Sequence, residues 1–135
     1  MGMRTLGVYI TCLATFLSLD AIWLGLVSPP VYARVLNGLL LDGFRPVPAL
    51  LFYLLYNAAI VVFVVPRSRP HPMASIAYGA FFGICAYGTY DLTNHAVLKA
   101  WTTELTVTDM AWGAVVTALA SLAAALMDRR LRQAV

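Results

Sequence analysis

Four long apolar runs constrain the fold of this chain more than any other feature. They cover residues 5–27, 48–65, 73–90 and 110–127, and the only charged residue within them is Asp20. A helix of about 18 residues is roughly 27 Å long, close to the ~30 Å hydrocarbon core of a bilayer. Lipid offers no partners for open backbone groups. The runs therefore predict membrane-spanning helices.

The predicted fold is all-α, a polytopic four-transmembrane-helix antiparallel bundle that forms a single membrane domain over residues 1–135. Composition supports this, because only 11% of the residues are charged against about 25% in ordinary soluble domains. The four helices are expected at about 5–27, 48–65, 73–98 and 108–127.

The ends of the predicted helices follow from their proline and capping residues. Ser28, Pro29 and Pro30 are expected to end the first helix, because proline cannot continue the hydrogen-bond ladder. Apolar residues then recur at helical spacing over 31–41, which favours a short helix lying at the membrane interface. Thr108 or Asp109 is expected to cap the last helix.

The basic residues predict the orientation. Six of the nine Lys and Arg side chains fall on one side of the predicted bundle, so the positive-inside rule places both termini in the cytoplasm. The net charge of +3 is attributed to anchoring against anionic headgroups. No basic stripe with interleaved aromatics is present, so no nucleic-acid partner is expected.

Three carboxylates from three helices are predicted to reach one level beneath the outer headgroups. They are Asp20, Asp91 and Asp109, and Asp91 shares one side of its helix with Tyr87, Asn94 and His95. An acid within the bilayer costs roughly 2.5–3.5 kcal/mol on insertion scales. We therefore expect a common polar chamber, in which two neighbouring acids would raise the pKa of one of them.

Several other side chains allow two interpretations. Trp23 and Trp112 each lie three residues after an acid and belong either to an interfacial aromatic belt or, for Trp112, to the wall of an apolar pocket. Asn57 either bonds between helices or forms the floor of that pocket. His95 either packs and hydrogen-bonds or serves a ligand, and without an HxxxH or HExxH pattern no metal site is predicted.

Three segments carry a resemblance to a known family. YLLYNAAIVVFVVP (53–66), YGAFFGICAYGTYDLTNHAVLKAW (78–101) and LTVTDMAWGAVVTAL (105–119) resemble the DUF2177 family of predicted bacterial membrane proteins. The most specific part is TYDLTN, followed by a tryptophan and then by D-x-x-W-G. The resemblance implies a multi-pass protein of the bacterial inner (cytoplasmic) membrane, and it brings no activity or cofactor with it.

Three functions are compatible with these patterns. The first is binding or modification of a membrane lipid or another lipid-like hydrophobic molecule, with Asp91 as acid or base and with Asp20 and Asp109 sharing its proton. Its ligand-binding residues would be Tyr87, Tyr90, Asn94, His95, Trp112, Trp23 and Asn57, and a metal or porphyrin site is a variant of it. The second is a small oligomeric transporter or a proton or cation pathway, and the third is a structural or accessory role.

Overall fold

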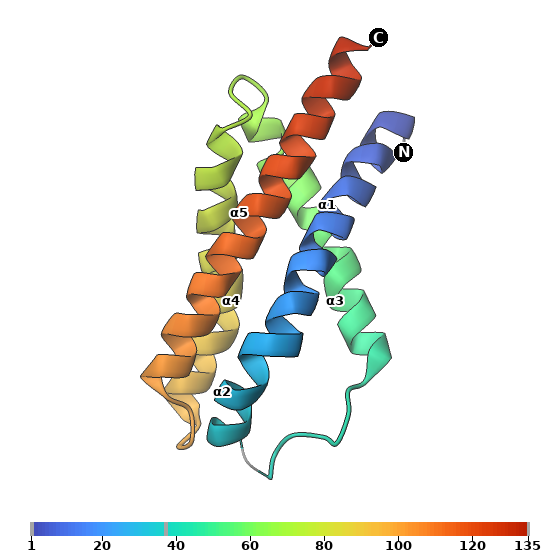
Figure 1. Cartoon of the computed structure of the whole chain (residues 1–135). Coiled ribbons are helices and arrows are strands. Elements are labelled where there is room, and N and C mark those ends of the chain that lie inside the picture. Colours follow the sequence, from blue (N-terminus) through green and yellow to red (C-terminus); the bar gives the residue numbers. More distant parts are fainter. Residues whose placement is uncertain (1, 37, 135) are drawn as a thin grey trace.

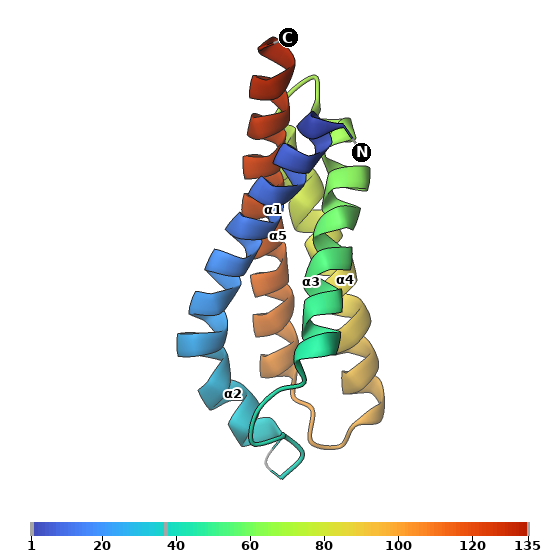
Figure 2. The same ribbon diagram turned by 90° about the vertical axis from the view of Figure 1, so that its right-hand side faces the viewer.

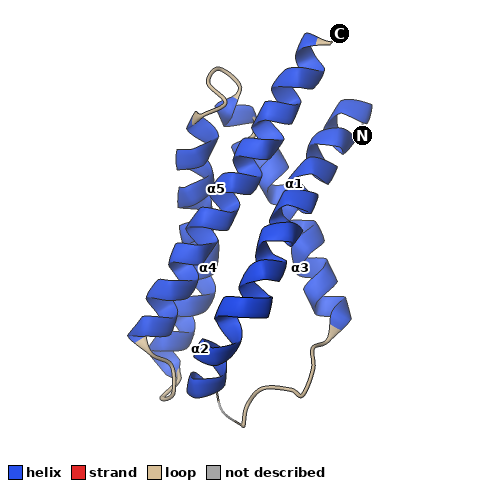
Figure 3. Ribbon diagram, in the orientation of Figure 1, coloured by secondary structure: helices blue, strands red, loops and turns tan. Residues whose placement is uncertain are grey.

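The computed structural model describes residues 2–36 and 38–134, which are mostly helical and contain no strand (Figures 1 and 3). Five α-helices form the framework, and shorter π- and 3-10 segments extend two of them. In chain order the elements are α1 (Met3–Ile22), the π-helix η1 (Trp23–Val27), α2 (Ser28–Val35), α3 (Pro46–Ala59), the π-helix η2 (Ile60–Val64), the 3-10 helix η3 (Pro66–Ser68), α4 (Ala74–Val97) and α5 (Thr103–Gln133).

Three helical segments of the described chain are long and apolar enough to cross a membrane: Met3–Leu26, Pro46–Ser68 and Thr103–Gln133. Helix α4 has 24 residues but is not among them, so three of the four predicted spans are confirmed by length and composition. Its last two turns carry the polar residues Asp91, Asn94 and His95.

The helices alternate in direction, and both ends of the described chain lie at one end of the molecule (Figures 1 and 2). Helices α4 and α5 pack along most of their length, and α1 packs against α5. Helix α3 meets α1, whereas α5 meets the continuous segment α3–η2–η3 through η2, and α4 meets it through η2 and η3. As a result α3 leans away from α4 and α5 at the end opposite the termini (Figure 1).

Close packing of α4 on α5 depends on two glycines of α4, Gly79 and Gly83, which are four residues apart. A Cβ at Gly79 would lie 2.6 Å from the hydroxyl of Ser121 and 2.9 Å from the carbonyl oxygen of Thr117. A Cβ at Gly83 would collide with the backbone carbonyl of Gly113. Small residues let helix backbones approach closely, and here they do so within one chain.

Two predicted helix boundaries are wrong. The chain does not leave the helix at Pro29 and Pro30. It widens into η1, where the backbone N–H of Ser28 bonds to the carbonyl of Trp23, and continues as α2. The prolines fall in the first turn of α2, where their fixed φ is compatible with a helix.

The continuation of the helix through Pro29 and Pro30 also changes the start and end of the predicted interfacial helix. The helix following the first span exists, but it ends at Val35 and continues directly from η1. The predicted segment 31–41 is therefore helical only in its first part, and the exposed Leu39, Leu40 and Leu41 follow in the loop.

The second wrong boundary is the start of the last helix. The N-cap is Thr102, whose hydroxyl accepts a hydrogen bond from the backbone N–H of Leu105 at 3.2 Å. Asp109 is therefore nearly two turns inside α5 instead of at its N-terminus. The carboxylate cannot be explained by capping, and its partners must come from other helices.

The end that carries the termini is held by one buried carboxylate. Asp128 is 3% exposed and pairs with three guanidinium groups, those of Arg4 at 3.4 Å, Arg69 at 3.4 Å and Arg132 at 3.1 Å. The three arginines belong to α1, to the connection between η3 and α4, and to α5. The cluster therefore ties three segments of the chain together at this end.

Candidate functional site

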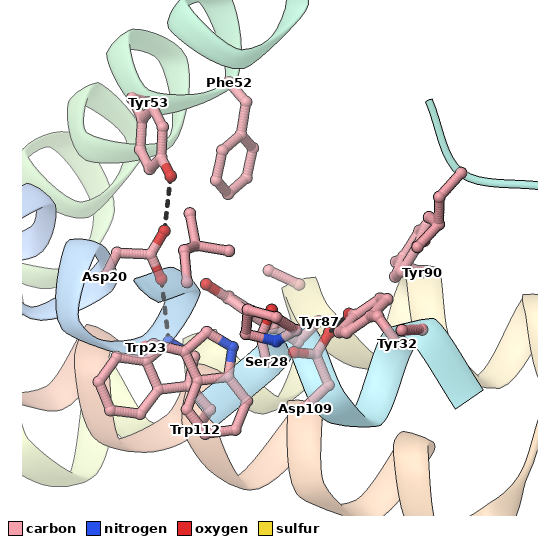
Figure 4. Close-up of a pocket in the computed structure, with 15 residues that line it drawn as sticks. Asp20, Trp23, Ser28, Tyr32, Phe52, Tyr53, Tyr87, Tyr90, Asp109 and Trp112 are labelled. Carbon is pink, nitrogen blue, oxygen red and sulfur yellow. Dashed lines mark hydrogen bonds between the residues drawn. The ribbon is translucent and has the colours of Figure 1, made fainter. Parts of the chain in front are cut away.

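A cavity of about 750 Å³ lies toward the opposite end, where α3 leans away from the bundle (Figure 4). Seven of its 15 lining residues are aromatic, and two are aspartates. Its size falls within the usual range for small-molecule sites. The lining residues are Asp20, Trp23, Leu24, Ser28, Pro29, Tyr32, Ala33, Leu40, Phe52, Tyr53, Ala86, Tyr87, Tyr90, Asp109 and Trp112.

Asp20 enters this cavity from α1 and is held by two donors from other helices. Its carboxylate accepts a hydrogen bond from the Tyr53 hydroxyl at 2.6 Å and another from the Trp112 indole N–H at 2.9 Å. The ring of Phe16, which is fully buried, packs edge-on against Tyr53. Asp20 is only 6% exposed, and the donors from α3 and α5 fix its carboxylate in place.

Asp109 enters the same cavity from α5 and is held by α2. Its Oδ2 accepts a hydrogen bond from the Tyr32 hydroxyl at 2.8 Å. Burial, followed by the adjacent Asp109 carboxylate, raises the pKa of the Tyr32 hydroxyl well above its usual range. Tyr32 therefore keeps its proton and remains a hydrogen-bond donor to Asp109.

Asp91 lies behind Asp109 and is fully buried, with 0% exposure. Its carboxyl group lies near that of Asp109. Neither Asp91 oxygen has a donor among the described residues. Because two carboxylates are both acceptors, a hydrogen bond between them requires that one of them carries a proton.

The structure therefore brings the three predicted acids to one region without merging them into one cluster. Asp91 and Asp109 form a pair, while Asp20 lines the same cavity with its own donors. Among the described residues, no group of three His, Cys, Asp or Glu side chains has the geometry to hold a metal ion.

The aromatic wall is built on two local features of the helices. Trp23, the first residue of η1, stacks on Trp112 of α5 with ring centroids 4.8 Å apart and planes 3° from parallel. Tyr87 lies directly over Gly113, which has no side chain to displace the ring. Trp112 therefore lies in the wall of the cavity.

Tyr90 also lines the cavity, while its ring packs edge-on against Trp101 at 5.3 Å between centroids. Trp101 is itself 5% exposed and packs with Leu36 and Leu105.

Three of the predicted ligand-binding residues do not line the cavity. Asn94 is half-buried, and His95 is exposed with its Nδ1 3.3 Å from the Thr106 hydroxyl. Asn57 is fully buried and takes the interhelical role: its Oδ1 accepts a bond from the Cys12 thiol at 3.3 Å, and its amide donates to the carbonyl of Tyr53 at 2.9 Å.

Tyr32 and Tyr53, which supply hydroxyl donors to Asp109 and Asp20, were not predicted as site residues. Phe52 and Ser28 were missed as well, although both line the cavity. The sequence does carry one signal for the two tyrosines. Each places a hydroxyl in an apolar segment near the expected level of an acid, and a buried hydroxyl needs a hydrogen-bond partner.

Comparison with known proteins places the chain in a family. The family model described as "Predicted membrane protein (DUF2177)" matches residues 5–126. The chain therefore belongs to the DUF2177 family and is a membrane protein. No curated protein and no solved structure matches it significantly.

Proposed function

We propose that the protein binds a lipid-like hydrophobic molecule in the cavity between α1, η1, α2, α3, α4 and α5. The observation that carries the proposal is the cavity itself: about 750 Å³, walled largely by aromatic and aliphatic side chains, with Asp20 and Asp109 as its fixed polar groups. An apolar pocket with a few convergent polar groups is the usual form of a small-molecule site.

The surroundings of the cavity favour a ligand that arrives from the membrane. Apolar side chains are exposed along α3 and η2, among them Leu51, Leu55 and Phe63, as expected for a lipid-facing surface. The loop beside the cavity also exposes Leu39 and Phe44, at 72% and 78%. An amphiphile in the bilayer therefore meets apolar protein surface up to the edge of the site.

The paired carboxyls would supply acid–base chemistry if the ligand is modified and not only held. A proton shared between Asp91 and Asp109 places a donor beside an acceptor. Asp109 lines the cavity and Asp91 lies behind it, so Asp109 is the group that would meet the ligand. Asp91 would then take or return the proton.

The proposed membrane topology has four spans, which are the three candidate segments and α4. Both termini would lie in the cytoplasm of a bacterial inner membrane. The basic cluster around Asp128 would lie at the cytoplasmic end and the cavity beneath the outer headgroups. Reporter fusions to the C-terminus and to the loop after α4 test this topology. Cytoplasmic activity of the C-terminal fusion and external activity of the loop fusion are expected, and the reverse contradicts it.

Mass spectrometry of the purified protein tests the ligand directly. In the wild type we expect one lipid-like species to remain bound at near-stoichiometric occupancy through delipidation in a maltoside detergent. Ala86→Leu places bulk in the cavity and should remove that species. Ala111→Leu adds the same bulk at an exposed position of α5 and should leave it unchanged.

Ala33→Phe, on the exposed surface of α2 where it meets the cavity, gives a second filling variant that does not disturb the core. Retention of only bulk lipids in bulk proportion, unchanged in both filling variants, would contradict the proposed function.

A further inference from the structure

We infer that the polar end of the ligand is a cation: an alkylammonium or quaternary ammonium group on a hydrophobic molecule. This inference rests on the proposed function, because it names the chemistry of the molecule that the cavity would hold. It is carried by the combination of carboxylates and aromatic rings around one apolar space.

The charged side chains that line the cavity are acidic. Asp20 and Asp109 line the cavity, and none of its described lining residues is Lys or Arg. The donors that reach the two acids are the hydroxyls of Tyr53 and Tyr32 and the indole of Trp112. These groups are neutral, so they orient the carboxylates without cancelling their charge.

The two carboxyl oxygens of Asp91 are fully buried and have no donor among the described residues. A proton shared with Asp109 removes one negative charge from that pair and leaves the other. Together with Asp20, the cavity region is therefore acidic. An unpaired charge in a low-dielectric site is expensive, so a cationic ligand would be stabilised there and an anionic ligand would be repelled.

The aromatic rings that line the cavity also suit a cation. Aromatic faces attract cations within about 6 Å of the ring centroid, and cages of such rings are the usual means of recognising quaternary ammonium groups. The stacked pair of Trp23 and Trp112, with Tyr87 and Tyr90, lines the same cavity as the carboxylates (Figure 4). Aromatic rings beside carboxylates suit an organic ammonium better than a metal ion, which takes its ligands from oxygen, nitrogen or sulfur atoms.

Three probes with the same chain and different headgroups separate charge from hydrophobicity. Hexadecyltrimethylammonium, hexadecanol and hexadecyl sulfate are each titrated against the purified full-length protein in neutral maltoside micelles, and occupancy is read by native mass spectrometry. We expect hexadecyltrimethylammonium to bind about tenfold more tightly than hexadecanol, and hexadecyl sulfate to bind most weakly.

The variants decide whether the cavity carboxylates cause this preference. Asp20→Asn and Asp109→Asn should each remove most of the advantage of the ammonium probe over hexadecanol, and circular dichroism shows whether each variant is folded. Glu104→Gln is the matched control, because Glu104 carries the same charge at the same end of the bundle but is exposed and outside the cavity. Comparing variants with one probe cancels differences in partitioning.

The outcomes distinguish this inference from the function on which it rests. Equal binding of the ammonium and the alcohol, or tightest binding of the sulfate, overturns the inference while the Ala86-sensitive binding of hexadecanol upholds the proposed function. An ammonium preference that Glu104→Gln removes as well as Asp20→Asn also overturns it. Failure of all three probes to bind at an Ala86-sensitive site overturns both.

Discussion

Replacing Gly113 by alanine is expected to force α4 and α5 apart at the cavity wall. The new methyl carbon would lie 2.8 Å from Cβ of Tyr87 and closer still to ring atoms of the same residue. Side-chain rotation moves the ring but not its Cβ. The backbone of α4 must therefore retreat by about 0.6 Å, the difference between 2.8 Å and the 3.4 Å at which ordinary contact begins.

The expected destabilisation follows from two opposed terms. Overpacking a well-packed interior usually costs about 1–3 kcal/mol, whereas replacing a helical glycine with alanine returns up to about 1 kcal/mol of helix propensity. With the full gain the net cost is about 0–2 kcal/mol. Because rotation of the Tyr87 side chain cannot relieve the contact with its Cβ, we expect the upper half of this range, a fall of about 1–2 kcal/mol in the free energy of unfolding. Displacement of the Tyr87 ring should also lower ligand retention, because Tyr87 lines the cavity.

Unfolding by sodium dodecyl sulfate in mixed micelles, followed by circular dichroism, measures this change. Gly25→Ala is the matched control, since a Cβ at Gly25 meets nothing within 4 Å, and it should leave stability unchanged or raise it slightly. If Gly113→Ala proved as stable as the wild type and retained its ligand, the contact between α4 and α5 would not be as described.

Three further predictions concern single contacts. Tyr53→Phe removes the donor to Asp20 and should lower the free energy of unfolding by about 1.5–3 kcal/mol, the range for hydrogen bonds to charged groups; an unchanged denaturation curve would count against that bond. Asp128→Asn leaves three guanidinium groups without their carboxylate and should lower the free energy of unfolding by about 1–3 kcal/mol. The loss is smaller than for a fully buried pair because the arginines are partly exposed, and a loss that added salt does not change would argue against an ionic cause. A membrane-permeant maleimide should label the exposed Cys85 well before the buried Cys12 in the folded protein, and equal rates read by mass spectrometry would contradict the placement of α1.

The sequence predicted the helices well because apolar runs of membrane length leave few alternatives. Its errors came from local rules applied without their tertiary setting. The prolines at 29 and 30 break a regular α-helix, but after a π-helical turn they begin a new one. Thr102, not Thr108 or Asp109, caps α5, because the helix extends beyond the apolar run that predicted its start.

The site was predicted in part, since the position of an acid along a helix can be read from sequence. Asp20, Asp91 and Asp109 were expected at one level, and the structure places all three buried around one cavity region. The depth of the cavity could not be read in this way. It extends from Asp109 toward Tyr87, so Asn94 and His95, further along α4, fall outside it.

The donors to the acids were missed for a different reason. Tyr32 and Tyr53 reach Asp109 and Asp20 across 77 and 33 residues of sequence. Such pairings depend on how each helix is rotated about its axis relative to its neighbours. A period of 3.6 residues gives the apolar face of one helix, but it does not give the angle between two helices.

Site-specific photocrosslinking in cell membranes tests the central claim, occupancy of the cavity, most directly. Benzoylphenylalanine is placed at Phe52, which lines the cavity, or at Phe63, which is similarly exposed but outside it (45% and 54%). The account predicts that Phe52 captures one hydrophobic species far above its share of bulk lipid, whereas Phe63 captures bulk lipids in proportion. The same bulk profile at both positions would contradict it.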